Sequence, residues 1–382
     1  MRILVAPDKF KGSLTSEQVA QLIAAALGGV LSDAVIETMP IADGGEGTAN
    51  VISQALCGER ITCPAHDALG HEIEAEYFWL AERRTAVMEM SAAAGLWRIV
   101  PEERDLLRAD TFGVGEMIKD AVRRDVREIL IGLGGSATND GGFGMARALG
   151  FQFPANEHEI ESPAELVSLA RIICSYAAPD LTALSRQDRE RASAVFPRVV
   201  AAVDVRNPLL GSRGATRTFG PQKGGTSEQL EILESGLTRL ADVVARDLGS
   251  DFRNTPGAGA AGGLGFGLMS FCGATVKSGF EVVAEFIGLS AAIANADVVI
   301  TGEGRLDEQS LEGKAPAGVA RLAREAGKRV FAIAGSASDA PAVRALFDNV
   351  LVLARPPITP TESTARASEL LLERARELAG MM

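Results

Sequence analysis

Short apolar runs that end in polar, glycine-bearing loops recur along the first part of the chain. The run over 129–131 is brief and ends in glycine instead of continuing with helical period, which predicts a buried strand. A strand is also predicted over 3–5, and an extended segment over 35–41. Amphipathic helical patterns follow these loops. Thr15 and Gln18 form a predicted capping box at the first of the helices. Repeated strand–loop–helix units of this kind predict a parallel sheet covered by helices.

The same scheme returns near the C-terminus. Strands are predicted over 298–300, 330–334 and 350–353, and a final helix over 367–378. Similar units at both ends of the chain predict one discontinuous domain, and the extended segments between them favour antiparallel pairing. We therefore expect an α/β protein with two α/β domains. A doubly wound parallel-sheet domain of flavodoxin or Rossmann type comprises 1–62 and 290–382, a mixed α/β domain comprises 63–289, and the active-site cleft is expected between them.

Length and charge limit the classes of function. The chain has 382 residues, which favours two domains over a single core, and only 5% of the residues are aromatic. The net charge of −12 and the lack of a basic run argue against a nucleic-acid partner. No apolar run reaches the ~20 residues of a membrane span, and the N-terminal strand leads directly to charged residues. We expect a cytoplasmic protein, either a monomer or a homodimer.

Cysteine and histidine spacing offers a weak case for zinc. Cys57, Cys63, His66 and His71 form a conceivable quartet, but their gaps do not match paired zinc ligands. Free thiols and surface histidines are the simpler interpretation.

The densest glycine loop, over 134–142, predicts an anion site. It reads Gly-Gly-Ser-Ala-Thr-Asn-Asp-Gly-Gly and joins a predicted strand to a predicted helix. Glycines leave main-chain amides unobstructed, and a helix N-terminus attracts negative charge. A tight turn that needs glycine only for its geometry is the alternative. A second glycine run, 257–265, contains G-x-G-x-x-G without the preceding strand of a dinucleotide site, so close helix packing competes there with phosphate binding.

Acidic loops follow the other predicted strands. The loops 43–47 and 302–307 carry carboxylates beside glycines, and the loop 8–13 carries an aspartate and two lysines. Carboxylates close to a phosphate site require a divalent cation, and Mg²⁺ typically binds one or two carboxylates plus phosphate oxygens. Positioning, a metal, cationic groups and a base are the requirements of phosphoryl transfer. No Walker A loop, Gly-x-Ser-x-Gly elbow or catalytic-looking histidine is present.

Six of these motifs together resemble the bacterial glycerate kinase type 1 family. They lie at 6–14, 42–48, 134–142, 219–224, 257–263 and 301–307, in the family's order and over essentially the whole chain. The resemblance implies two α/β domains with the active site in the cleft. It also implies that ATP phosphorylates D-glycerate with Mg²⁺, giving most often 2-phosphoglycerate. Lys9 stands where many relatives carry Ser, and Val203 where Cys is common; the former could alter substrate affinity.

We assign hypothetical roles to the loop residues. Asp8 is the candidate general base, Lys9 or Lys11 a clamp for carboxylate or phosphate, and Arg305 a bidentate carboxylate clamp. Asp43 and Glu46 are candidates for the metal or the glycerate hydroxyls, with helix N-capping as the alternative. The alternative for Asp8 and the lysines is a solvated loop. The full set predicted to act in catalysis is Asp8, Lys9, Lys11, Asp43 and Arg305; in nucleotide binding Gly134, Gly135, Ser136, Thr138, Asn139, Gly257 and Gly259; and in metal binding Glu46, Asp140, Glu303 and Asp307.

Two other functions remain open from the sequence. The parallel sheet and the 257–262 glycines suggest a nicotinamide-dependent hydroxyacid dehydrogenase, although the missing strand opposes it. A non-catalytic organic-acid sensor is the third possibility, and ATP turnover with glycerate would exclude it.

Overall fold

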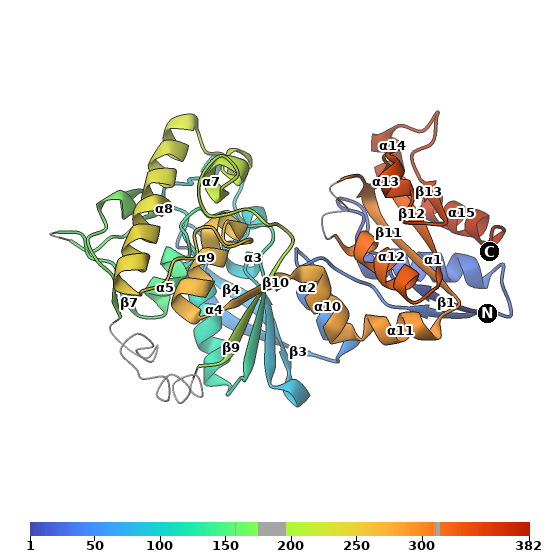
Figure 1. Ribbon diagram of the computed structural model, residues 1–382, viewed down its shortest axis with the longest axis horizontal. Coiled ribbons are helices and arrows are strands. Elements are labelled where there is room, and N and C mark those ends of the chain that lie inside the picture. Colours follow the sequence, from blue (N-terminus) through green and yellow to red (C-terminus); the bar gives the residue numbers. More distant parts are fainter. Residues whose placement is uncertain (157, 175–195, 309, 311–313) are drawn as a thin grey trace. The chain divides into compact units, whose positions relative to one another are not determined.

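The chain folds into two compact units. The computed structural model describes residues 1–382 except 157, 175–195, 309 and 311–313. Unit 1 comprises Met1–Leu56 and Ser278–Met382, and unit 2 comprises Cys57–Lys277 (Figure 1). The sequence pattern set the boundaries later, at 62 and 289. β3 (Glu59–His66) pairs with β4 (Glu72–Leu80) of unit 2, and α10 (Gly279–Ile287) contacts α2 (Thr48–Ala55) of unit 1, which explains the earlier divisions.

Unit 1 contains an entirely parallel sheet. Its strand order is β13-β12-β11-β1-β2, with β1 (Arg2–Val5) beside both β2 (Val35–Thr38) and β11 (Val298–Leu306). β12 (Arg329–Ala337) and β13 (Asn349–Val352) extend the sheet beyond β11. This is a doubly wound arrangement, because the strand order reverses at β1: β2 lies on one side of β1, and β11, β12 and β13 follow on the other. The predicted fold class is confirmed.

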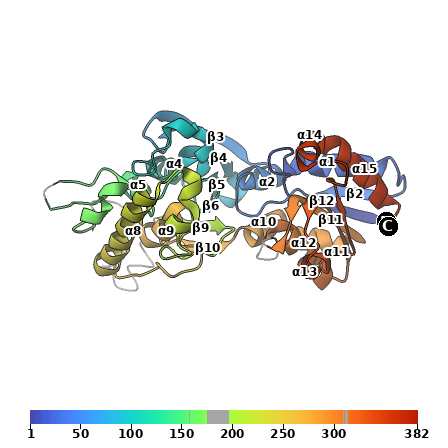
Figure 2. The ribbon, with the colours of Figure 1, turned by 90° about the horizontal axis from the view of Figure 1, so that it is seen from above.

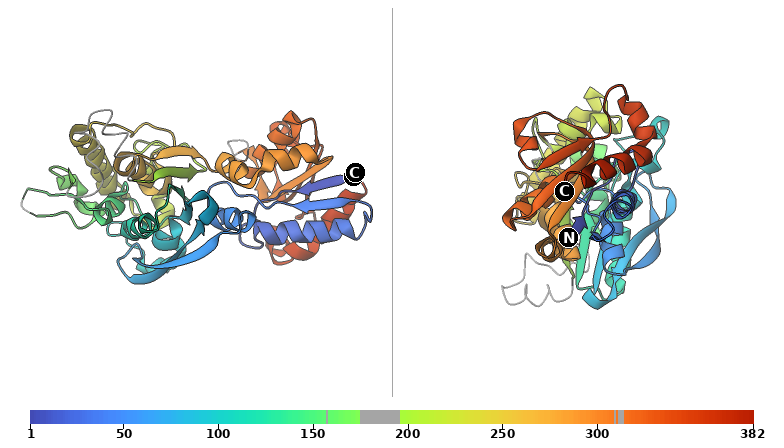
Figure 3. Two further views of the ribbon diagram at one scale, coloured as in Figure 1. Left: turned by 90° about the horizontal axis from the view of Figure 1, so that it is seen from below. Right: turned by 90° about the vertical axis from the view of Figure 1, so that its right-hand side faces the viewer.

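Helices cover both faces of this sheet. α1 (Ser16–Gly28) and α15 (Ala367–Ala379) contact each other and share an apolar core with the strands. Figure 2 shows them on one side of the sheet, with α11 (Leu289–Asn295) and α12 (Ala315–Glu325) on the other, and Figure 3 shows the same layers from below. The capping box predicted at Thr15 and Gln18 is confirmed. The remaining short helices are α13 (Pro341–Arg344) and α14 (Pro360–Ala365).

Unit 2 contains a mixed sheet. Its order is β10-β9-β6-β5-β4-β3, and β3, β4 and β5 (Thr85–Glu89) pair antiparallel as predicted. β5, β6 (Glu128–Gly132) and β9 (Arg198–Val203) pair in parallel, so their carboxyl ends lie at one edge of the sheet. β10 (Thr275–Ser278) ends the sheet at the boundary between the units. Loops after parallel strands are where α/β proteins bind ligands.

Six helices build the rest of unit 2. They are α3 (Ser91–Ala94), α4 (Phe112–Arg123), α5 (Phe143–Ala148), α7 (Ala215–Phe219), α8 (Ser227–Asp247) and α9 (Ala260–Cys272), each within the described residues. A small ladder joins β7 (Phe151–Gln152) to β8 (Ile173–Cys174). The sequence pattern predicts helices and variable loops over 154–193, and half of that stretch, 157 and 175–193, lies outside the described residues. No helix in the described part of the chain has the length and apolarity needed to cross a bilayer.

Candidate functional site

The 134–142 loop connects β6 to α5, as its sequence predicts. Asp140 fixes its second half: the carboxylate accepts hydrogen bonds from Thr111 N (2.9 Å), Thr111 Oγ1 (2.7 Å), Gly142 N (3.0 Å) and Gly144 N (2.9 Å). The side chain is fully buried, and that burial raises its pKa. Because these four donors occupy the carboxylate, Asp140 holds the loop against α5, and we leave it out of the metal site proposed below.

The first half of the loop carries unpaired amides. The N–H of Ala137 donates to Ala94 O (2.9 Å). The amides of Gly134, Gly135, Ser136, Thr138 and Asn139 have no hydrogen-bond partner among the described residues. Gly135 is exposed and has φ +68°, a left-handed conformation that glycine adopts without strain. Unpaired main-chain N–H groups in a glycine loop are the donors from which anion-binding nests are built, and we call this half of the loop the nest below.

A buried lysine supports this nest, and the sequence analysis missed it. Lys223 is 3% exposed, and its Nζ donates to Ser136 Oγ (2.7 Å) and Thr138 O (2.6 Å). Burial lowers its pKa to about 7. Lys223 lies in the 219–224 motif, but a lone lysine between a glutamine and a glycine gives no local signal of burial. The loop therefore has a titratable amine directly beneath it.

Two further polar atoms of the loop lack partners. Thr138 Oγ1 and Asn139 Oδ1 are buried without a hydrogen bond among the described residues, while Asn139 Nδ2 donates to Thr216 Oγ1 (3.0 Å). Unsatisfied buried oxygens are costly, and native sites usually satisfy them with water or ligand. The loop thus retains hydrogen-bonding capacity on its amides and on these side chains.

The second glycine run packs against the back of the loop. Gly141 N donates to Gly262 O (3.1 Å), and a Cβ on Gly262 would lie 1.9 Å from Thr138 O. Gly257 and Gly259 are buried, and a Cβ on Gly259 would lie 2.3 Å from Pro208 O. Close packing, the alternative weighed from the sequence, accounts for these glycines. A nucleotide contact at Gly257 and Gly259 stays a prediction.

A second cluster, of buried acids, lies at the switch point of the unit 1 sheet. Asp8 follows β1, its N–H donates to Gly302 O (2.8 Å), and its side chain is 5% exposed. Burial, and then the charge of Asp43, raise the pKa of Asp8 to about 8. Glu303, in β11, has a pKa raised to about 7, first by burial and then, among charges, by Asp43 and Asp307. A carboxyl with a pKa near neutrality is suited to proton transfer.

The 43–47 loop completes this acid cluster. Gly45 N donates to Asp43 Oδ1 (3.2 Å), and Lys9 Nζ donates to Glu46 O. The N-cap residue of α2 is Gly47, without a side-chain cap, so the helix-capping alternative for Asp43 and Glu46 is not what the fold uses. Glu46 itself is exposed. Asp43 is thus the carboxylate of this loop that interacts electrostatically with Asp8 and Glu303.

The remaining predicted residues lie in the same unit. Arg305 is 77% exposed at its side chain, and its Nε lies 3.1 Å from Asp307 Oδ2. Ser310 Oγ donates to Glu303 Oε1 (2.6 Å) and fixes that carboxylate. Lys11 lies beside a cavity of about 100 Å³ whose lining includes Ser13, Gly304, Gly335, Ser336, Leu353 and Thr364. Within the described residues, no three His, Cys, Asp or Glu side chains converge as ligands of one ion.

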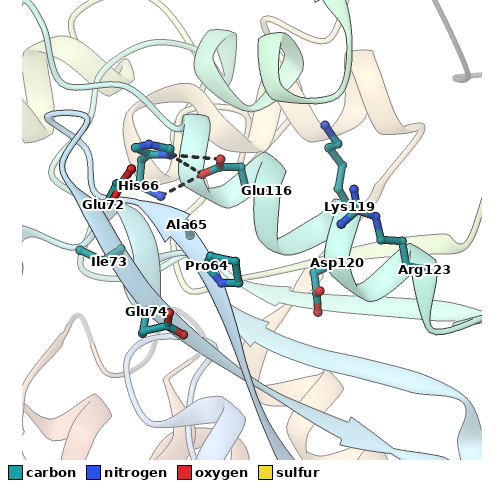
Figure 4. Close-up of a pocket in the computed structure, with 10 residues that line it drawn as sticks. All are labelled: Pro64, Ala65, His66, Glu72, Ile73, Glu74, Glu116, Lys119, Asp120 and Arg123. Atoms are coloured by element: carbon teal, nitrogen blue, oxygen red, sulfur yellow. Dashed lines mark hydrogen bonds and ion pairs between the residues drawn. The ribbon is translucent and has the colours of Figure 1, made fainter.

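Two larger cavities in unit 2, of about 570 and 550 Å³, lie at other residues. The first is shown in Figure 4, where His66 Nδ1 lies 3.0 Å from Glu116 Oε2. Neither is lined by a residue predicted to act in catalysis, nucleotide binding or metal binding, although His66 of the conceivable zinc quartet lines both. His71 Nδ1 lies 3.0 Å from Asp67 Oδ2, and the four cysteines are free thiols. The two histidines of the conceivable zinc quartet therefore pair with carboxylates.

Comparison with known proteins agrees with the motif pattern. The model of the glycerate kinase family matches residues 3–382. A glycerate kinase of Bacillus subtilis is 38% identical over 99% of this chain and 97% of its own length, and a glycerate 2-kinase of Escherichia coli is 40% identical over 89% and 86%. A crystal structure of a putative glycerate kinase 2 from Salmonella typhimurium LT2 superposes with a TM-score of 0.83, at 39% identity, over 100% of this chain and 98% of that one. The chain belongs to the glycerate kinase family.

Proposed function

We propose that this protein transfers the γ-phosphoryl group of ATP to D-glycerate and forms 2-phosphoglycerate. The observation that carries the proposal is the set of unpaired amides at 134–136, 138 and 139 beside a buried lysine, in a chain of the glycerate kinase family. The relatives named above are glycerate kinases, and one is named a glycerate 2-kinase. The choice of the 2-hydroxyl rests on that one name and on the motif resemblance.

In this proposal unit 2 holds the nucleotide phosphates. Phosphate oxygens accept hydrogen bonds from the amides of Gly134, Gly135 and Ser136. The buried residues Thr138 and Asn139 supply two further amides. Lys223 places a cation beneath them when it is protonated. A bound polyphosphate favours that protonated form, because an anion nearby raises the pKa of a lysine.

Unit 1 in this proposal holds glycerate and performs the proton transfer. Asp8 accepts the proton of the attacking hydroxyl, since its raised pKa keeps it a usable base near neutral pH. Lys9, Lys11 and Arg305 are the cations available for the glycerate carboxylate, and the exposed Arg305 guanidinium is the one with bidentate geometry. We propose that the two units contribute these groups to one reaction.

The acid cluster fits a magnesium ion. Asp43 raises the pKa values of both Asp8 and Glu303, so these carboxylates are held close together with too little positive charge nearby. Since no three side chains converge, the ion would be held by one or two carboxylates and by substrate oxygens, which is how Mg²⁺ usually binds. The candidates are Asp43, Glu303 and Asp307, with Glu46 as an exposed fourth. Bound there, Mg²⁺ would neutralise charge on the transferring phosphoryl group.

The competing functions have less support. A dinucleotide fingerprint needs a strand that leads directly into its glycines, and residues 251–259 contain none. Packing against 138–141 also occupies the glycines at 262 and 263. A sensor would not require a base with a tuned pKa.

One assay tests the proposal directly. Purified protein is incubated with ATP, D-glycerate and MgCl₂, ADP release is followed by a coupled assay, and the product is identified by ³¹P NMR. We expect ADP formation that depends on both D-glycerate and Mg²⁺, with the phosphorus resonance of 2-phosphoglycerate. Absence of turnover with D-glycerate by folded protein would refute the proposal, and 3-phosphoglycerate as product would correct its position of attack.

A further inference from the structure

An exposed tryptophan lies beside the anion-binding loop. Trp97 belongs to a short 3-10 turn, Leu96–Arg98, that follows β5 and α3. Leu96 N donates to Gly135 O (2.8 Å), and Gly95 forms an antiparallel bridge with Ser136. The indole is therefore carried by a segment that is hydrogen-bonded to the rim of the loop. Both segments emerge at the carboxyl ends of neighbouring parallel strands, β5 and β6.

The Trp97 side chain is exposed but held in place. It is 65% exposed, and it is the sole aromatic among the large exposed apolar residues in the described part of the chain. Its Nε1–H donates to Ser91 O (3.1 Å). The indole also lies directly over Gly95, where an added Cβ would be 2.6 Å from Nε1. A surface tryptophan with a fixed edge has already lost the side-chain freedom that binding would otherwise remove.

A cation covers part of this indole. The guanidinium carbon of Arg98 lies 4.5 Å from the centre of a Trp97 ring, within cation–π distance. Much of the ring nevertheless stays open to solvent, as the exposed fraction shows. The open part of the ring offers a flat aromatic face that a second planar group can stack on. The chemistry that matches an open aromatic face beside a phosphate nest is a nucleobase, because every base offers a π-face for stacking.

We propose that Trp97 is the stacking surface for the purine base of the nucleotide whose phosphates occupy the 134–139 amides. This inference rests on the proposed function for the identity of the nucleotide. It adds the base-binding residue, which neither the motifs nor the glycine loops indicated. Trp97 contacts the ligand through its ring alone, so it determines affinity for the base and leaves phosphoryl transfer to other residues.

The chain offers a matched control, since it contains two tryptophans. Trp79, in β4, is partly buried and packs on the core of unit 2. In W79F, Trp97 is the single tryptophan, and we expect ATP or ADP to change its fluorescence saturably. In W97F, with Trp79 as the single tryptophan, we expect little change. A saturable response that persists in W97F and is missing from W79F would overturn the proposal.

Kinetics separate the base from the phosphates. In W97A we expect the KM for ATP to rise about tenfold or more, the range of base–aromatic stacking, with the KM for D-glycerate unchanged. Inhibition by tripolyphosphate, which has no base, should be the same in W97A and in wild type. W79F should match wild type in all three measurements. An unchanged KM for ATP, or an equal loss of affinity for ATP and tripolyphosphate, would refute base stacking.

Failure of the two proposals can be told apart. Wild-type protein without D-glycerate-dependent turnover contradicts the proposed function, while nucleotide-dependent quenching of Trp97 in W79F would still support the stacking surface. Active wild type with an unaltered W97A contradicts the stacking surface alone. Size-exclusion chromatography of W97A tests a different occupant. If the apparent mass of W97A is half that of wild type, the indole is a contact between subunits, and base stacking is refuted.

Discussion

Replacing Lys223 with methionine should change how stability depends on pH. The substitution keeps the length of the side chain and removes the amine that donates to Ser136 Oγ and Thr138 O. Burial lowers the pKa of Lys223 from 10.5 to about 7. A shift of this size corresponds to a cost of about 5 kcal/mol for keeping the ammonium charged in the apo fold. The cost is fully present below pH 7, because the amine is then charged in both the folded and the unfolded state.

The sign of the effect follows from proton binding. Between pH 7 and 10.5 the unfolded chain binds the proton and the folded chain does not, so the free energy of unfolding rises with pH across this window. From pH 7 to pH 9 the Lys223 contribution to that rise is about 2 kcal/mol, because half of the folded molecules still carry the proton at pH 7. The methionine variant has no such contribution. We therefore expect the stability of K223M, measured against that of wild type, to be higher at pH 6.5 than at pH 9.

Urea denaturation at pH 6.5 and pH 9 measures this difference. The quantity to compare is the pH-dependent change in unfolding free energy of wild type minus that of K223M, which cancels every other titrating group common to both. Equal changes in the two proteins would refute the burial argument. Leaving Ser136 Oγ and Thr138 O without their donor lowers the stability of K223M at both pH values, and this offset does not affect the comparison.

ATP binding supplies an independent readout. At pH 8 an amine of pKa about 7 is mostly neutral, so a polyphosphate that restores its charge should draw up about 0.9 proton per site. Calorimetry in buffers of different ionisation enthalpy counts these protons, and K223M should show none from this position. Turnover by K223M should fall ~10²-fold, because a cation near the transferring charge is lost. Identical proton uptake in both proteins would exclude Lys223 from the phosphate site.

Three further predictions concern the two clusters. Asp8→Asn should keep its fold, by circular dichroism, and lose ~10²-fold or more in kcat, and near-normal turnover would remove Asp8 from the mechanism. In wild type, kcat/KM should rise with pH up to about pH 8, because the raised pKa of Asp8 sets the acidic limb of the profile. In Asp43→Asn the residual activity should show this limb at lower pH, since the charge that helps to raise the pKa of Asp8 is gone. An acidic limb at the same pH in both proteins would contradict the assignment. Gly262→Ala should lower the unfolding free energy by ~2–5 kcal/mol in urea titration, since its Cβ would meet Thr138 O at a φ of +68°, and a wild-type midpoint would disprove that close packing.

Local pattern was sufficient for most of the fold. The capping box at Thr15 and the short apolar runs that form β1, β6, β11, β12 and β13 are short-range features, and they are found in the structure. β2 is shorter than the extended segment predicted over 35–41, because strand pairing with β1 ends at Thr38. Periodicity reports which residues are apolar, and it does not report where pairing stops.

The candidate site was only partly predictable. Glycine content pointed to the 134–142 loop, but not to which of its amides stay unpaired, because Ala94 and Gly262 reach that loop from distant parts of the chain. Burial of Lys223 likewise depends on residues that lie about 85 positions away. Residue type predicts a metal ligand at Asp140, but it gives no sign that four donors surround this carboxylate. The metal role of Asp140 stays a prediction.

The interleaved strand order of unit 1 has a consequence for synthesis of the protein. Residues 1–56 leave the ribosome first, yet β1 pairs on one side with β11, which is made almost 300 residues later. Unit 2 is continuous in sequence, and all of it has been translated before β11 exists. One edge of β1 therefore stays unpaired while unit 2 is synthesised and folds. Chaperones that shield an exposed strand edge would act on the nascent chain during that interval.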